Sequence, residues 1–382
     1  MSIPLQIPGP SRHIPSLDGL RGLAILVVVV YHYFNLPYGW SGVDLFFVLS
    51  GYLITGRLLD SLHQPAYYRN FYRNRVLRIF PLYFGVLALF AFGINFISKQ
   101  STQPLLAFYY QHWLSFILFT ENFSFIRYGM PVTPYLLHFW SLAIEEQFYL
   151  VWPFLLRRTK DRKTRLILLP VLILLVMLIR SLFYWNHIHT DSLTFYYYNT
   201  FFRIDALLTG ALLCQLHRSQ LVLPARLINL LFAACILTIG ISCVWLKSLD
   251  LSNPFFETVG YTLTALLYAC LLHKTVSSTG ALSKIFSLSP LRLLGKISYG
   301  LYVFHFPVVL ILYTRLFNWG KAHSALSDLP LQIAVLLLCL LISLVLALLS
   351  FRYFESFFLR FKAPAPASSA PTSSGTSSHT RY

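Results

Sequence analysis

The stretch LDGLRGLAILVVVVYH, from Leu17 to His32, places a guanidinium and an imidazole in a run that is otherwise mostly apolar. The stretch HFWSLAIEEQF, from His138 to Phe148, does the same with two adjacent carboxylates. Both belong to segments of the roughly 20 mostly apolar residues that a helix needs to cross a bilayer. A charged side chain at bilayer depth costs at least ~2.5 kcal/mol and usually marks a pathway or a reaction site. The two stretches therefore predict a membrane protein with polar chemistry in its interior.

The composition of the whole chain also favours a membrane protein. Its 382 residues are 57% hydrophobic and only 11% charged, whereas soluble domains carry about 25% charged residues. The net charge of +17 is typical of cytoplasmic loops rich in Lys and Arg, so we expect a lipid bilayer and no nucleic acid as partner. The five cysteines lie in apolar segments without metal-ligand spacing. We expect them to be core residues, and no metal site is predicted.

Ten segments are long and apolar enough to be interpreted as transmembrane helices. They cover residues 20–37, 42–61, 77–98, 138–156, 166–186, 195–216, 226–247, 254–273, 296–318 and 330–354. A further apolar stretch, 104–120, is rich in aromatic residues and interrupted by His112, which predicts a re-entrant or interfacial segment. The expected fold class is an all-α membrane protein of about ten transmembrane helices with a polar cavity inside the membrane.

The loops between these segments indicate the orientation of the chain. Loops after the second, fourth, sixth and eighth segments are rich in Arg and Lys, and the intervening loops carry few. Under the positive-inside rule, both termini are expected in the cytoplasm. Three regions follow: a cytoplasmic N-terminal segment, 1–15, a multi-pass domain, 16–360, and a cytoplasmic tail, 361–382. The tail is rich in Pro, Ala, Ser and Thr and is expected to be disordered.

This topology places several polar side chains at overlapping depths in the membrane. Five of the predicted helices contribute to this layer, which consists of His32, Asp44, Ser50, Ser141, Glu145, Glu146, Arg203, Asp205 and His305. Scattered polar residues would not form one layer, so a shared cavity is expected. Taken singly, Arg203 with Asp205 fits a structural contact between helices equally well, because a buried charge needs a partner. Glu145 and Glu146 point about 100° apart on a helix, so one is expected to face the cavity and the other an arginine.

Arg21 and His32 define one face of the first predicted helix. Their spacing of eleven residues brings them within about 20° of the same face and roughly 16 Å apart along the axis. A basic cytoplasmic edge and a deep imidazole suit a long ligand with an anionic head and a reactive tip, because guanidinium groups match phosphate oxygens. This geometry predicts that Arg21 binds ligand phosphates and that His32 meets the reactive end.

Four further arginines follow the second predicted helix, at positions 69, 73, 75 and 78. Arg75 and Arg78 are neighbours on one helix face, and we assign them to the same ligand. Arg69 and Arg73 fit ligand phosphates and anionic lipid equally well, since a basic juxtamembrane segment attracts anionic lipid at about 1 kcal/mol per charge.

Six stretches of the sequence form a specific set when they are taken together. They are Leu17–Ala24 with His32, Gly42–Thr55, Arg73–Pro81, Trp140–Tyr149, Phe202–Ala206 and Ile297–His305. In this order, and over about residues 16–358, the chain resembles the bacterial membrane acyltransferase-3 family. The members of this family are integral-membrane O-acyltransferases that act on cell-surface glycans.

The resemblance implies a role in donor handling and catalysis for Arg21 with His32, and for Arg75 with Arg78. It implies acyl-CoA, expected here as acetyl-CoA, as the donor substrate, with no permanently bound cofactor. The acceptor is expected to be a hydroxyl of a carbohydrate or glycolipid that is part of the cell surface or secreted, and the location the bacterial cytoplasmic (inner) membrane. Fused members carry an extracytoplasmic esterase domain, and none follows the tenth segment in this sequence. The expectation is that a separate periplasmic transferase receives the acyl group, or that the chain acts directly on a lipid-linked or small glycoside.

The resulting hypothesis is acyl transfer from a thioester to a hydroxyl. His32 is the expected general base, since an imidazole titrates near neutral pH, and Glu145 is expected to orient it or to stabilise its charged form. Arg203 or His305 is expected to stabilise the oxyanion.

Three alternatives stay open at this point. A covalent intermediate on Ser50 or Ser141 has no Gly-x-Ser-x-Gly elbow to support it. A transporter of acyl groups or glycans without transfer chemistry would also hold buried His, Glu and Arg, but no symmetry between two halves of the chain supports it. An assembly partner in glycan synthesis would use the polar layer for complex formation only.

Overall fold

In the computed structural model, the described residues are 14–98, 103–159, 161–188, 192–219, 221, 223–277, 280–324 and 326–363. The predictions for residues 1–13 and for the tail from 364 onward lie outside these ranges. All regular elements of the described part are helical.

The helices follow the predicted apolar segments closely. The long helices are α1 (Pro15–Phe34), α2 (Gly42–Asp60), α3 (Tyr67–Ser98), α7 (Trp140–Arg158), α8 (Arg162–Trp185), α10 (Thr200–Arg218), α11 (Ala225–Leu246), α12 (Tyr261–Val276), α14 (Ser289–His323) and α15 (Asp328–Leu349). The shorter ones are α4 (Gln103–Gln111), α5 (Trp113–Ile117), α6 (Glu121–Tyr128), α9 (Ser192–Tyr197), α13 (Ala281–Phe286) and α16 (Ser356–Leu359). Short 3-10 turns cover Gly39–Ser41 and Leu137–Phe139, and π turns cover Phe256–Gly260 and Ser350–Glu355.

Seven helices of the described part are long and apolar enough to cross a membrane. They are Pro15–Phe34, Gly39–Asp60, Tyr67–Gly93, Arg162–Trp185, Ala225–Leu246, Ser289–His323 and Asp328–Leu359. The predicted spans built on α7, α10 and α12 are not among them, so the number ten stays a prediction. Two of these three helices carry part of the polar layer, α7 with Glu145 and Glu146 and α10 with Arg203 and Asp205.

The stretch 104–120, predicted to be re-entrant or interfacial, is divided at His112. α4 ends at Gln111 and α5 begins at Trp113. The hydroxyl of Ser115 donates to the His112 carbonyl at 2.7 Å. Neither short helix reaches the length of about 20 residues that a span requires.

Two helix crossings are so close that only glycine fits between the backbones. Where α1 meets α14, a Cβ on Gly22 would lie 2.0 Å from the carbonyl oxygen of Leu291. Where α2 meets α10, a Cβ on Gly51 would lie 1.9 Å from the carbonyl oxygen of Leu207. Both separations are far below a van der Waals contact, so the backbones touch directly. These crossings fix the relative positions of helices that carry much of the polar layer.

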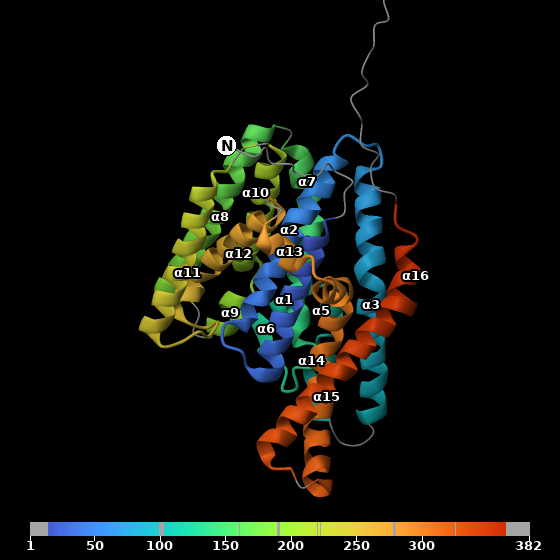
Figure 1. Ribbon diagram of the computed structural model, residues 1–382. Helices are drawn as coiled ribbons and strands as arrows, with labels where there is room; N and C mark the ends of the chain where they lie inside the picture. Colours follow the sequence, from blue (N-terminus) through green and yellow to red (C-terminus); the bar gives the residue numbers. More distant parts are fainter. Residues whose placement is uncertain are drawn as a thin grey trace, which may run out of the picture.

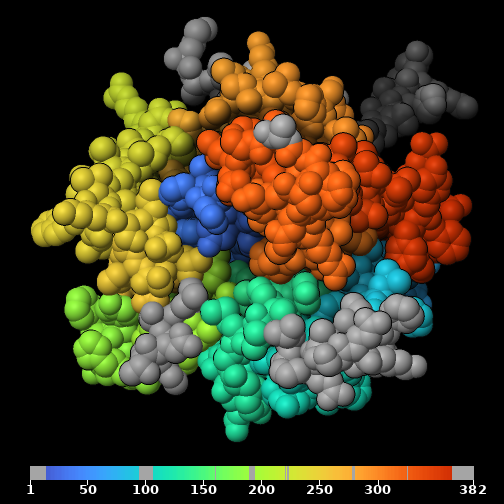
Figure 2. Space-filling view, turned by 90° about the horizontal axis from the view of Figure 1, so that it is seen from below, coloured from blue at the N-terminus to red at the C-terminus, as the bar shows by residue number. Residues whose placement is uncertain are grey.

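The last described part of the chain returns to α3. After α15, the π turn Ser350–Glu355 and α16 both contact α3, and Figure 1 shows α16 beside that helix. The backbone amide of Ala363 then donates to Asn74 Oδ1 at 2.8 Å. Seen from below, Figure 2 shows the α14–α15 hairpin at the centre of the face, with α1 next to it.

Candidate functional site

A cavity of about 110 Å³ lies among α1, α2, α3, α7 and α14. Six of the residues predicted for the site line it: Arg21, Ser50, Arg75, Arg78, Ser141 and Glu145. The rest of the lining is aromatic, aliphatic or hydroxyl-bearing, and includes Phe46, Tyr149, Ser298, Tyr299 and Tyr302. We call this cavity the arginine pocket. It brings basic groups together with hydroxyls and one carboxyl in an otherwise apolar surrounding.

One wall of the arginine pocket is a small hydrogen-bonded cluster. The hydroxyls of Ser50 and Tyr149 hydrogen-bond with each other, and the carboxyl of Glu145 interacts with both. Glu146 does not line the pocket, as expected from the 100° between consecutive helix positions. Its Oε1 is buried without a hydrogen-bond partner among the described residues. Glu145 is thus part of the pocket wall.

The side chain beside His32 is His305 of α14, with His32 Nδ1 3.1 Å from His305 Nε2. On its other side, His305 Nδ1 lies 2.7 Å from the Tyr302 carbonyl oxygen and 3.1 Å from that of Leu301. A carbonyl oxygen only accepts, so His305 Nδ1 carries the proton and its Nε2 is an acceptor. His32 Nδ1 therefore donates, as it also does to the Val28 carbonyl at 3.1 Å. These partners leave His32 Nε2 with its lone pair, which is the form that a general base needs.

A third imidazole, His138, lies next to this pair. Its ring centroid is 5.5 Å from that of His305, and its Nε2 donates to the Val303 carbonyl at 3.2 Å. That carbonyl has no partner four residues later in α14, because Pro307 has no N–H. The Nδ1 atom of His138 is buried and has no hydrogen-bond partner in the part of the chain described. The proline thus creates the acceptor that fixes the His138 ring.

The arginine pocket and the imidazole pair are neighbours but not one cavity. α14 lines the pocket up to Tyr302, and His305 follows about one turn later. The hydroxyl of Tyr302 donates to the His138 carbonyl at 2.8 Å and lies 2.5 Å from Ser141 Oγ. Neither imidazole of the pair is part of the pocket lining. The shared cavity expected from the sequence is therefore divided, with Tyr302 at the boundary.

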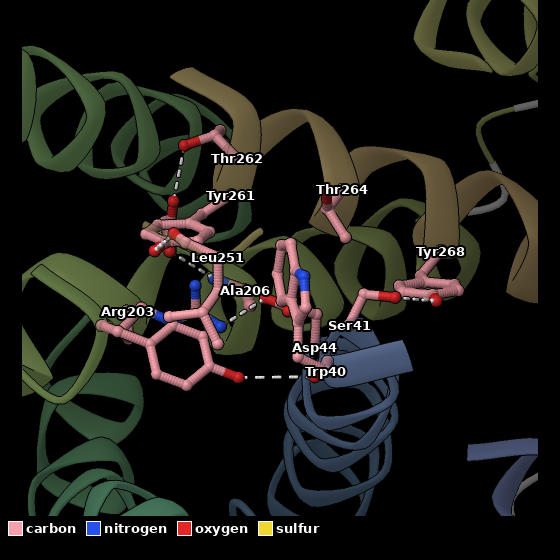
Figure 3. A network of polar contacts seen from close by, with 12 residues as sticks. Trp40, Ser41, Asp44, Arg203, Ala206, Leu251, Tyr261, Thr262, Thr264 and Tyr268 are labelled. Atoms are coloured by element: carbon pink, nitrogen blue, oxygen red, sulfur yellow. Dashed lines mark hydrogen bonds and ion pairs between the residues drawn. The ribbon is translucent and has the colours of Figure 1, made fainter. Parts of the chain in front are cut away.

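The remaining predicted polar residues, Asp44, Arg203 and Asp205, belong to two buried ion pairs. Arg203 Nη2 lies 2.8 Å from Asp44 Oδ1 and joins α10 to α2, as Figure 3 shows. Arg180 Nη1 lies 3.1 Å from Asp205 Oδ2 and joins α8 to α10. The Arg203 guanidinium also lies 4.1 Å from the ring centroid of Tyr261. All four charged side chains are at most 1% exposed, so these contacts hold helices together rather than face the pocket.

Sequence reasoning overlooked two of these residues. Arg180 is the only charged residue in the predicted span 166–186, and that isolation was the available signal for a buried partner. The sequence marks His138 only as the first residue of a motif. Arg69 and Arg73 are exposed and lie outside the pocket lining. Within the described residues, no group of three or more His, Cys, Asp or Glu side chains is arranged to hold a metal ion.

Comparisons with known proteins place the chain in a family. Residues 14–348 match a family described as an acyltransferase domain. The chain is 35% identical over 317 residues to the peptidoglycan O-acetyltransferase OatA of Listeria monocytogenes, covering 78% of this chain and 50% of that protein. It is 33% identical over 327 residues to the putative peptidoglycan O-acetyltransferase YrhL of Bacillus subtilis, covering 78% and 49%. With the O-acetyltransferase OatA of Staphylococcus aureus, the identity is 27% over 373 residues, covering 90% and 57%.

The chain thus spans about half the length of the curated relatives that it matches. Residues 14–348, which match the family, contain the helices that form the arginine pocket and the imidazole pair. No solved structure is a significant match to the chain.

Proposed function

The chain belongs to the acyltransferase-3 family, and on this premise we propose that it transfers an acetyl group from acetyl-CoA to a hydroxyl of a cell-wall glycan. Relatives named as peptidoglycan O-acetyltransferases support this acceptor class. We place the protein in the bacterial cytoplasmic membrane with both termini in the cytoplasm. The basic loops support this orientation.

The donor is proposed to bind with its phosphates at the three pocket arginines and its thioester toward Tyr302. One observation carries this proposal: α1 holds Arg21 in the pocket and His32 in the imidazole pair, roughly 16 Å further along the axis. The cavity of about 110 Å³ is small beside the roughly 300–1,000 Å³ of pockets that enclose drug-sized ligands. It suits the thioester end of the donor, and the nucleotide would lie at the basic mouth.

The proposed reaction is direct attack by the acceptor. His32 Nε2 takes the proton from the acceptor hydroxyl while the oxygen attacks the thioester carbonyl. The resulting imidazolium donates its Nδ1–H to His305 Nε2. The tetrahedral intermediate then expels the CoA thiolate, which receives the proton back from His32. The products are an ester and CoA thiol, and His32 returns to its starting tautomer.

The contacts in the structure favour a different oxyanion donor from the two expected from the sequence, Arg203 and His305. Arg203 is committed to Asp44, and His305 Nε2 accepts from His32. The Tyr302 proton goes to the His138 carbonyl. The hydroxyl of Ser141 also lines the pocket and can turn toward a bound thioester, so we assign oxyanion stabilisation to it. Glu145 is proposed to fix the positions of the Ser50 and Tyr149 side chains in the pocket wall, and not to orient His32.

The test is acetyl-CoA turnover by the purified protein in lipid nanodiscs with soluble peptidoglycan fragments. Wild type is expected to release CoA and to form the glycan ester. His32→Ala is expected to lose about 10²–10⁴ in kcat with donor binding intact, and Arg21→Ala to raise the KM for acetyl-CoA. Arg226→Ala, which removes an exposed arginine at the start of α11, is the matched control and should behave as wild type.

Three outcomes contradict parts of this proposal. No thioester cleavage by wild type would favour a transporter without chemistry. Normal turnover by His32→Ala would make His32 structural. CoA release that requires a second, periplasmic protein for ester formation would replace direct transfer by hand-over of the acyl group.

A further inference from the structure

The C-terminal segment 360–363, which we call the strap, lies against the basic side of the arginine pocket. Its anchor is the hydrogen bond of 2.8 Å from the Ala363 amide to Asn74 Oδ1. Asn74 immediately precedes Arg75, which lines the pocket. The contacts of α16 with α3 hold the strap from its other end, as Figure 1 shows. The strap is therefore fixed to the helix that supplies two of the pocket's arginines.

Lys362, the residue before the anchored amide, is half-buried beside four guanidinium groups. Burial has the largest effect, and together with the positive charges of these arginines it lowers the pKa of Lys362 to about 7. In order of decreasing effect, the four are Arg78, Arg75, Arg57 and Arg21. They come from α1, α2 and α3, so the strap brings Lys362 to the point where the cationic ends of three helices meet.

The ammonium group of Lys362 forms no ion pair with any described residue. The nearby carboxylates pair with the arginines instead. Asp18 lies 3.6 Å from Arg21. Glu355, at the end of the π turn before α16, interacts with the charge of Arg78. A half-buried cation whose nearest charges are positive loses hydration without gaining a partner. Such an arrangement is stabilised when an anion with several charges enters between the cations.

We propose that Lys362 binds the phosphate groups of the donor together with the pocket arginines, and that the strap exists to deliver it there. This inference rests on the proposed function, because the ligand is taken to be a thioester of a nucleotide with several phosphates. The headgroup of an anionic lipid offers the same phosphate chemistry, and the experiment below separates the two sources.

The geometry has a consequence for pH dependence. Phosphate binds the ammonium form of Lys362, so donor affinity falls as the pH rises above about 7, where the free lysine loses its proton. The arginines that face it stay charged over this range, and the phosphomonoester is mostly doubly charged above pH 6.5. Lys362→Arg keeps its charge throughout, so this variant should lose the pH dependence between 6.5 and 8.5.

The test measures CoA affinity of the full chain in nanodiscs of neutral lipid by titration calorimetry at pH 7. Lys362→Gln is expected to bind CoA about three- to tenfold more weakly than wild type, while Lys362→Arg stays close to wild type. Lys284→Gln, which removes an exposed lysine of α13, is the control for net charge and should leave the affinity unchanged. Acetyl-pantetheine carries no phosphate, so wild type and Lys362→Gln should use it as donor equally well.

A second variant checks the anchor. Asn74→Ala removes the acceptor of the Ala363 amide and should weaken CoA binding in the same direction as Lys362→Gln. The double variant should be little weaker than Lys362→Gln alone, because both changes remove the same contact.

Several results would overturn the inference. Equal CoA affinity in wild type and Lys362→Gln would do so while leaving the proposed function intact. A loss with acetyl-pantetheine as large as with CoA would make Lys362 structural. An effect of Lys362→Gln that appears only on binding to anionic nanodiscs would assign the site to lipid. Failure of wild type to bind CoA at all would overturn the proposed donor together with the strap.

Discussion

Replacement of His305 by alanine should lower the turnover of acetyl-CoA while leaving the general base in place. In the structure, His305 Nε2 accepts from His32 Nδ1 at 3.1 Å. When His32 becomes an imidazolium, this hydrogen bond has a charged donor and is worth about 1.5–3 kcal/mol. The Val28 carbonyl, also 3.1 Å from Nδ1, keeps the tautomer in the variant. We therefore expect a loss of about 10- to 100-fold in kcat, compared with about 10²–10⁴ for His32→Ala.

The assay is CoA release at saturating acceptor, with kcat and the KM for acetyl-CoA determined separately. The KM should not change, because neither imidazole of the pair lines the arginine pocket. His217→Ala is a matched control. It removes an imidazole from another buried pair, in which His217 Nε2 lies 2.8 Å from His273 Nδ1, and its kcat should equal that of wild type. Thermal unfolding of His305→Ala and His217→Ala shows how much stability each variant loses, so that a loss of kcat can be separated from a loss of folded protein.

Three results for His305→Ala would refute this reasoning. A kcat equal to that of wild type would show that His305 does not stabilise the charged form of His32. A loss as large as that of His32→Ala would show that His305 is itself the base. A raised KM for acetyl-CoA with an unchanged kcat would place His305 in the donor site, contrary to the lining of the pocket.

Two further predictions concern the stability of the fold. Arg180→Ala leaves Asp205 charged and buried without its partner at 3.1 Å, and should lower the free energy of unfolding by about 3–5 kcal/mol. Lys321→Ala breaks an exposed ion pair and should cost no more than about 1 kcal/mol. Equal losses of unfolding free energy for the two variants in denaturant would contradict the buried ion pair of Arg180 with Asp205. Gly51→Ala places a Cβ 1.9 Å from a carbonyl oxygen of α10 and should lower the melting temperature strongly. Gly240→Ala, with open space around it, should not, and similar melting temperatures for the two variants would argue against direct backbone contact.

The positions of the helices could be predicted from the sequence because a bilayer demands long apolar runs. The predicted segment 226–247 became α11, Ala225–Leu246, since nothing in it competes with a plain apolar helix. The prediction was less complete where polar residues interrupt the pattern. The segment 195–216 is divided, because Asn199 accepts from the Phe201 amide at 3.0 Å and begins a new helix there.

The contacts within the site depend on which helices cross, and local sequence does not encode this. The sequence allows Arg203 and Asp205 to form one structural contact. However, residues that are two positions apart on a helix point about 200° away from each other. Each therefore has a partner on another helix, Asp44 for Arg203 and Arg180 for Asp205. That angular argument was available from the sequence, but the identity of the partners was not.

Other parts of the site join residues that are far apart in the chain. His32 and His305 are 273 positions apart, and Lys362 reaches arginines near the other end of the sequence. The sequence indicates that Arg21, Arg75 and Arg78 belong together, because all three are basic and lie at the cytoplasmic ends of predicted membrane-spanning segments. Lys362 follows the last predicted membrane-spanning segment, and nothing in the sequence around it indicates that it reaches these arginines.

The direct contact of α1 with α14 at Gly22 has a mechanical consequence. The two helices that carry the imidazole pair pack against each other, with their backbones in direct contact at this point. A rocking motion of the kind that exposes a transporter's site alternately to the two sides would have to separate them. We therefore expect the pair to stay assembled during turnover, so that neither substrate has to use binding free energy to align it.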